Sequence, residues 1–290
     1  MISPYVRRLR LAAELRDLRQ AADLTHEKLA KLAGLNRQMI SKLENGHVAP
    51  DQDDVLSLLN ALGVTGDRWT ELVHIANEAA SRGWWESVAR QIGERQSLFA
   101  NLEAGAATIF EYAQAIIPGL LQTEAYTRAR VEIAAGRPIP EGMTTAGILK
   151  GRATRQQLLR RSGNGPGYEA IIDAIAISRP TVPPAILREQ LLDMVSAAKA
   201  EDRITVRVLP VDAEIEHYNV PLCPFSLYAY ANGDPDVVAI EAVTTDVVLT
   251  DPAESAVYGN VAEALRRAAL SVADSQEYMA EAAHTLPSDD

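Results

Sequence analysis

The sequence contains a single cysteine, Cys223, in 290 residues. One cysteine excludes a disulfide within the chain, and it excludes zinc and iron–sulfur sites built from several thiolates. The five histidines are scattered at no spacing typical of a metal site. We therefore expect no metal and no cofactor. This cysteine usage suits a reducing cytoplasm, where we expect the protein to be located.

Long apolar runs are also missing. No segment offers the roughly 18–20 uninterrupted apolar residues of a membrane-spanning helix, and no apolar stretch follows the first arginines as in a secretory signal. The Gly-x-Ser-x-Gly, His-Glu-x-x-His and Cys-x-x-Cys motifs are absent. We expect neither a membrane protein nor an enzyme. Because 47% of the residues are apolar, the chain is long and apolar enough for two packed domains.

Positive charge is scarce overall, and the formal net charge is -11. It is also unevenly divided: the first 50 residues hold nine Lys and Arg against five Asp and Glu, whereas the other 240 hold nineteen against thirty-four. Phosphate contacts supply most of the nonspecific affinity for DNA, so a basic segment can bind DNA although the rest is acidic. The amino-terminal end is therefore the candidate for DNA binding.

Residues 24–46, LTHEKLAKLAGLNRQMISKLENG, have the pattern of two short helices joined by a tight turn. Thr25 and Asn36 are N-cap candidates, because their side-chain oxygens can accept from free amides of a first helical turn. Gly34 can take a positive φ at no steric cost. The apolar residues on the inward face of the second helix are Met39, Ile40 and Leu43. The pattern predicts a helix-turn-helix.

The two helices are expected at about residues 25–33 and 37–44. The outward face of the second carries Arg37, Gln38, Ser41 and Lys42. This polar set suits the major groove, where arginine matches guanine and glutamine matches adenine. On an isolated helix the same set would be only a solvated face, but inside this motif we favour DNA contact.

Residues 10–80 resemble the DNA-binding domain of the phage-repressor and Cro-like family, also called the xenobiotic-response-element family. The segments LRDLRQAADLT and GLNRQMISKLENG and the later Pro50 carry the resemblance. It implies that the base-reading residues are Arg37, Gln38 and Lys42. It implies phosphate contacts by His26, Ser41 and Asn45, although His26 could instead pack beside the helix cap. It also implies that an ion pair between Arg19 and Glu44 braces the first helix of the domain against the recognition helix.

Three further helices are expected to complete this domain, at about residues 5–22, 53–62 and 67–80. A junction follows at residues 81–97, where Gly83 precedes Trp84 and Trp85. The two tryptophans could stack on a ligand. Adjacent residues point apart, however, so we favour a packing role for at least one of them.

The carboxy-terminal half shows a second resemblance, carried by IIPGLLQTEAYTRA, GRATRQQLL, REQLLDM, ITVRVLPVDA and DPDVVAIEA. These segments are similar to the carboxy-terminal domain of WhiJ-like actinomycete regulators. The resemblance implies an antitoxin-like or developmental repressor with a small protein partner encoded nearby. The stretch DAIAISRP departs from that pattern, which usually has an acidic residue and a leucine before the Arg-Pro.

The residues of this half predict a mixed α+β domain at 98–285 with a small, mostly antiparallel sheet, after a helix-turn-helix domain at 1–80, and with a tail at 286–290. We expect helices at 98–110, 145–161, 185–200 and 252–270, and strands at 168–177, 204–209, 225–230, 237–242 and 246–249. The last three strands should form an antiparallel meander. The arginines of 145–161 are expected to be solvated or to pair within the acidic domain.

A local cluster of titratable groups after one strand is the other candidate site: Glu214, His217 and Tyr218. It could bind a ligand or a partner, although a solvated loop explains it as well. Taken together, the sequence predicts a regulator that binds a double-stranded DNA operator as a homodimer, with an acidic domain that senses a ligand or a small protein. The alternative is an enzyme or ligand-binding protein in which the helix-turn-helix is accessory.

Overall fold

The computed structural model describes residues 2–46, 48–133, 142–159 and 165–287, and the chain divides into two compact units. The first unit consists of Met1–Ser87 and Ala231–Pro235, and the second of Val88–Tyr230 and Asp236–Asp290. Residues 160–161 of the expected basic helix and 288–290 of the expected tail lie outside the described residues.

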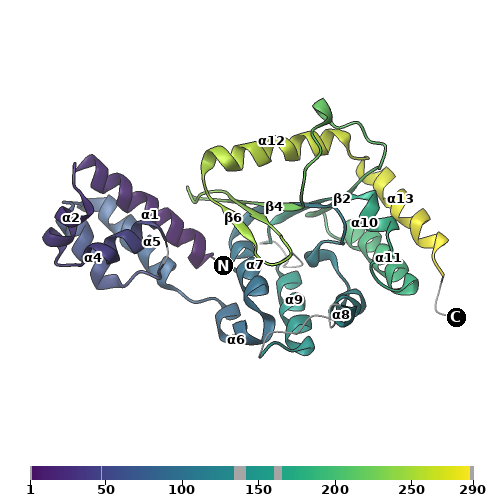
Figure 1. Ribbon diagram of the computed structural model, residues 1–290, viewed down its shortest axis with the longest axis horizontal. Helices are drawn as coiled ribbons and strands as arrows, with labels where there is room; N and C mark the ends of the chain where they lie inside the picture. Colours follow the sequence, from purple (N-terminus) through teal and green to yellow (C-terminus); the bar gives the residue numbers. More distant parts are fainter. Residues whose placement is uncertain (1, 47, 134–141, 160–164, 288–290) are drawn as a thin grey trace. The chain divides into compact units, whose positions relative to one another are not determined.

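The first unit contains five helices, as predicted (Figure 1): α1 (Pro4–Ala21), α2 (His26–Ala33), α3 (Arg37–Glu44), α4 (Gln52–Ala61) and α5 (Gly66–Ala80). Each contributes apolar side chains to one core, whose members include Leu15, Leu29, Ile40, Leu58 and Leu72. All five side chains are at most 1% exposed. The burial of this apolar surface is the main force that holds the short helices together.

The turn between α2 and α3 has the predicted chemistry. The Thr25 hydroxyl oxygen accepts a hydrogen bond from the Lys28 amide at 3.2 Å, and the Asn36 side-chain oxygen accepts one from the Met39 amide at 2.8 Å. Gly34 ends α2 with a φ of 70°. In this left-handed conformation a side chain would be strained, so glycine lets the chain turn sharply into α3.

The second unit is built on a six-stranded sheet of order β3-β2-β1-β4-β5-β6. Its strands are β1 (Ala106–Ala113), β2 (Gly167–Asp173), β3 (Ile204–Leu209), β4 (Phe225–Tyr230), β5 (Val237–Ile240) and β6 (Val247–Leu249). The pairs β1–β2 and β2–β3 are parallel, whereas β1–β4, β4–β5 and β5–β6 are antiparallel. The predicted α+β class, with a mostly antiparallel sheet and a meander of the last three strands, is confirmed.

The main error of the sequence prediction lies at the centre of this sheet. A single helix was expected at 98–110, but α7 (Glu94–Glu103) ends before Gly105, which has a φ of 80°, and β1 follows. Alanine-rich sequence favours a helix locally, yet pairing with β2 on one side and β4 on the other decides the structure. The strand expected at 168–177 also ends early. The Asp173 carboxylate accepts from the Ile175 amide at 2.9 Å and caps α10 (Ala174–Ser178).

Helices cover both faces of the sheet. Besides α7 and α10, the described chain after α5 has the α-helices α6 (Trp84–Ile92), α8 (Glu124–Ile133), α9 (Thr145–Leu159), α11 (Pro184–Ala200), α12 (Pro252–Ala268) and α13 (Val272–Thr285). Figure 1 shows α12 along one face, with α7 and α9 on the other. Between α12 and the sheet lies an apolar core that includes Tyr112, Phe225, Val238 and Leu265. In the part of the chain that the structure describes, no helix combines the length and apolar character needed to cross a bilayer.

Candidate nucleic-acid interface and a buried polar cavity

Helix α3 has one buried and one exposed face. Ile40 and Leu43 are 1% and 3% exposed and fix the helix to the core of the first unit. The side chains expected to read bases all lie on the exposed part of α3: Arg37, Gln38 and Lys42. A helix held by its apolar face, with hydrogen-bonding and cationic side chains outward, has the form needed to enter the major groove.

Arg37 has one partner within the unit. Its Nε lies 3.2 Å from Oε1 of Glu27 in α2, and the two side chains are 67% and 68% exposed. An ion pair this exposed contributes only about 0–1 kcal/mol. Glu27 therefore holds the Arg37 guanidinium only weakly.

The end of α3 is held to α1 through the buried carboxylate of Glu44, the last residue of α3. Glu44 is 4% exposed and accepts hydrogen bonds from Arg19 Nε at 2.7 Å and from Arg19 Nη2 at 2.8 Å. The hydrogen bond to Glu44 is the largest cause of a raised pKa of Arg19. A buried carboxylate is tolerated only when it is paired in this way. The pair joins α1 to the last turn of α3 and so fixes the recognition helix in orientation.

His26 lies at the same carboxylate, with its Nε2 3.1 Å from Oε2 of Glu44. Its ring is 35% exposed, so the structure gives it a partner inside the unit while part of the ring faces solvent. Asn45 and Ser41 lie together at the end of α3, where Asn45 Nδ2 donates to the Ser41 carbonyl at 2.6 Å. The structure thus brings together Arg19, Glu44 and His26, and separately Ser41 and Asn45.

The two tryptophans differ in burial. Trp85 is 2% exposed and Trp84 is half-buried. Their ring centroids are 6.0 Å apart in an edge-to-face arrangement. A Cβ added to Gly83 would come within 2.1 Å of the Trp85 ring, so Trp85 packs directly over glycine backbone. This is the environment of a packing residue.

The Glu214, His217 and Tyr218 cluster lies on the surface of the second unit. Tyr218 is 85% exposed, and the other two are exposed as well. The closest contact of His217 is to its neighbour Glu216, at 3.5 Å. None of the three side chains lines the polar cavity of this unit. Among the described residues, no group of three or more His, Cys, Asp or Glu is arranged to hold a metal ion.

The second unit also contains a polar cavity that no motif in the sequence indicates. It has a volume of about 550 Å³, and its walls come from α7, β1, α9, β4 and the end of β5. The charged residues that line it are Arg95, Glu103, Glu111, Arg130, Arg152, Arg155 and Glu241. The arginines of α9 were assigned a solvated or intramolecular role, and Arg155 does pair with Glu103 at 2.9 Å. No local motif marks the site, because its residues meet only in the folded sheet.

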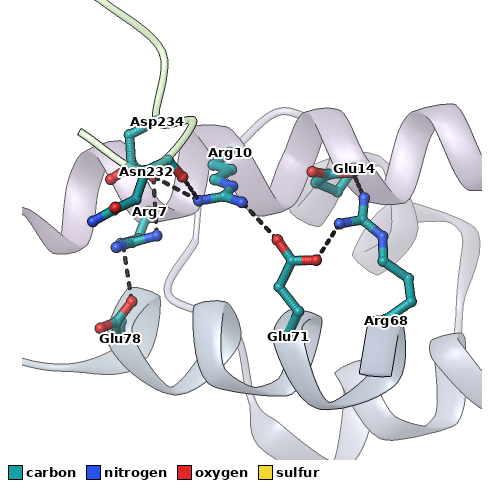
Figure 2. Close-up of polar contacts among 8 residues, drawn as sticks. All are labelled: Arg7, Arg10, Glu14, Arg68, Glu71, Glu78, Asn232 and Asp234. Atoms are coloured by element: carbon teal, nitrogen blue, oxygen red, sulfur yellow. Dashed lines mark hydrogen bonds and ion pairs between the residues drawn. The ribbon is translucent and has the colours of Figure 1, made fainter. Parts of the chain in front are cut away.

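A polar network in the first unit joins α1, α5 and the turn Ala231–Pro235, as Figure 2 shows. Arg7 Nε lies 2.9 Å from Oε2 of Glu78, and Arg7 Nη1 lies 3.1 Å from Oδ1 of Asp234. Arg10 donates to the Asn232 carbonyl and pairs with Glu71 at 2.8 Å. Two arginines of α1 therefore bind both α5 and the turn Ala231–Pro235, which lies more than two hundred residues later in the sequence.

Two family models match the chain. A model described as a helix-turn-helix domain matches residues 10–72. A model described as a domain of unknown function, DUF5753, matches residues 96–281. Comparison with curated proteins gives no match. Comparison with solved structures gives none either.

Proposed function

The chain belongs to the family defined by the domain of unknown function DUF5753, and because a helix-turn-helix domain precedes that domain, we propose that it is a sequence-specific, DNA-binding transcriptional regulator. The observation that carries the proposal is the geometry of α3. Its apolar face is buried, its end is braced by Arg19 and Glu44, and its polar face is exposed. Gln38 and Lys42 are exposed, and the ion pair of Arg37 with Glu27 is exposed enough to be exchanged at little cost.

In this proposal the exposed face of α3 enters the major groove. Arg37 donates two hydrogen bonds to a guanine edge, and Gln38 forms the matching pair with adenine, since these residues fit those bases. Lys42 donates to base edges in the same groove, and the other basic residues of the unit neutralise phosphates and supply the affinity that does not depend on sequence. Ser41, Asn45 and the exposed edge of His26 contact the DNA backbone and set the register of α3.

We further propose that the protein acts as a repressor and binds its operator as a homodimer. One recognition helix spans only a few base pairs, and two helices on half-sites about one helical turn apart give a regulator sufficient specificity. The operator is then an inverted repeat. In this scheme the acidic second unit senses a ligand or a small protein partner and changes operator affinity.

A selection experiment tests the proposal. The purified protein is incubated with random-sequence duplexes, bound DNA is recovered over several rounds, and the mass of the complex with a recovered site is measured by light scattering. Enrichment of one short inverted repeat, bound by two chains, supports the proposal. Failure to enrich any sequence contradicts specific DNA binding, and a single chain on a non-repeated site contradicts the dimer.

A further inference from the structure

The cavity of the second unit has the dimensions of a small-molecule site. Its volume of about 550 Å³ lies within the usual range of about 300–1,000 Å³ for ligand pockets. Phe99 and Tyr228 contribute aromatic surface, and glutamates and arginines contribute charge. Such a mixture of apolar wall and a few convergent charged groups is typical of a site that orients a ligand.

Four arginines line the cavity: Arg95, Arg130, Arg152 and Arg155. Arg95 pairs with Asp246 at 2.8 Å, and Arg130 donates to the Thr181 carbonyl at 3.1 Å. Arg155 is 8% exposed; its Nε donates to Glu103 at 2.9 Å, and its Nη1 donates to the Gln96 side chain. Its guanidinium also lies 5.5 Å from the centroid of the Phe99 ring. Arg155 is therefore a structural residue that joins α9 to α7.

Arg152, one turn earlier on α9, is different. Its Nε is buried and has no hydrogen-bond partner in the described chain. The guanidinium is held close to backbone, since a Cβ at Gly119 would come within 2.4 Å of Nη1. Burial and the nearby Arg155 lower the pKa of Arg152 to about 10, so it still carries a positive charge at neutral pH. The charges of Glu241, Glu103 and Glu111 act in the opposite direction on this pKa. A buried guanidinium nitrogen without a hydrogen-bond partner is costly, and a carboxylate is the group that pairs with a guanidinium best.

Two carboxylates in the same cavity feel the charge of nearby arginines but form no ion pair with them. Glu111, on β1, accepts a hydrogen bond from the Tyr168 hydroxyl at 2.8 Å. Burial, and after it the negative charge of Glu241, raise the pKa of Glu111 to about 7. Neither Glu111 nor Glu241 forms an ion pair with a lysine, arginine or histidine in the described ranges. A protonated amine placed beside them would relieve their repulsion and favour the ionised form of Glu111.

We propose that this cavity binds a small zwitterion that carries both a carboxylate and a protonated amine, of the amino-acid or short-peptide class. Arg152 takes the carboxylate, Glu111 and Glu241 take the amine, and the aromatic wall takes the side chain. A purely anionic ligand would face two glutamates, and a purely cationic one would face Arg152. The inference names a ligand class for the sensing role proposed above and rests on that role, but it does not depend on DNA binding.

Calorimetric titration of the full-length protein, without DNA, tests the inference. The probes are the twenty amino acids and their alanyl dipeptides. Each is compared with its N-acetylated form, which lacks the amine charge, and with its amide, which lacks the carboxylate. We expect at least one zwitterion to bind and both of its blocked forms to bind at least tenfold more weakly. Absence of binding by every probe, or equal binding of the blocked forms, would overturn the proposal.

Single substitutions then test which side chain binds the carboxylate of the ligand and which binds its amine. Arg152→Met is expected to weaken binding of the selected zwitterion at least tenfold and to leave binding of its amide unchanged. Glu111→Gln should weaken the zwitterion but not the N-acetylated form. Lys150→Met is the matched control, because this exposed residue lies on the same helix and does not line the cavity. Full affinity in Arg152→Met would contradict the assignment. The comparison of blocked probes on the unaltered protein decides the question even if a variant fails to fold. A negative result here leaves the proposed DNA binding untouched.

Discussion

Arg10 in α1 donates a hydrogen bond to the backbone oxygen of Asn232, 222 residues further along the chain. Asp234 pairs with Arg7 of the same helix (Figure 2). The turn Ala231–Pro235 is thus part of the DNA-binding unit, although it connects β4 to β5 of the second unit. Both of these strands contribute residues to the polar cavity. The chain therefore links the walls of the proposed ligand site directly to a turn held by α1.

Asp234→Ala should release this turn. The side chain of Asp234 is only 9% exposed and lies 3.1 Å from Arg7 and 3.6 Å from Arg10. Loss of a partner from a largely buried polar pair costs about 1–3 kcal/mol. We expect a lower melting temperature of the first unit and faster proteolytic cleavage within residues 231–235. Limited proteolysis followed by mass spectrometry measures this. Asp236 is an exposed aspartate two residues away, and the Asp236→Ala variant should be cleaved at the same rate as the unaltered protein. If both variants are cleaved at equal rates, the ion pairs do not hold the turn.

Glu44→Gln should destabilise the first unit strongly. The substitution leaves the Arg19 guanidinium, 12% exposed, without its carboxylate. Breaking a buried pair by removing one partner costs about 3–5 kcal/mol. Urea denaturation followed by tryptophan fluorescence reports this unit, because all three tryptophans lie in it. Glu27→Gln breaks the exposed pair with Arg37 and should cost less than about 1 kcal/mol. A similar small loss for both variants would contradict the bracing role of Glu44.

Glu111 should make the stability of the second unit depend on pH. Burial raises its pKa from 4.5 to about 7 in the folded state. Between these pH values the folded chain holds a proton that the unfolded chain has lost. The free energy of unfolding therefore falls as pH rises from about 4.5 to about 7, by at most about 1.4 kcal/mol per pH unit from this group, and the loss levels off above pH 7.

Urea denaturation at pH 5, 6, 7 and 8, followed by circular dichroism, measures this slope. Glu111→Gln carries no titratable group at that position and should flatten the slope. Glu277→Gln, an exposed residue of α13, should leave it unchanged. If Glu111→Gln keeps the slope of the unaltered protein, the pH dependence has another origin.

The elements that were predicted well from the sequence are those whose ends are marked by capping and turn residues. Helices α2 and α3 were located because Thr25, Gly34 and Asn36 each act within a few residues of their own position. Strand β1 was missed because its two partners are β2 and β4, and its alanine-rich sequence alone favours a helix. Tertiary pairing outweighs helix propensity there.

The cavity and the turn could not be predicted for the same reason. Glu111 and Arg152 carry no special signal in their own segments. They come to line one cavity only after α9 has packed against the sheet that contains β1. The segment Ala231–Pro235 forms the turn between β4 and β5. Its attachment to Arg7 and Arg10 has no local signature, because the partners lie at the opposite end of the chain.

The most direct test of the central claim is an anisotropy titration of the selected duplex with the unaltered protein and with Arg37→Ala combined with Lys42→Ala. A specific base contact contributes about 1–3 kcal/mol, so the double variant should bind at least tenfold more weakly, while both proteins bind a scrambled duplex with affinities that differ far less. Lys199→Ala, an exposed lysine of the second unit, should bind both duplexes as the unaltered protein does. Equal affinity of the double variant for the selected duplex would mean that α3 does not read the operator, and the proposed function would be wrong.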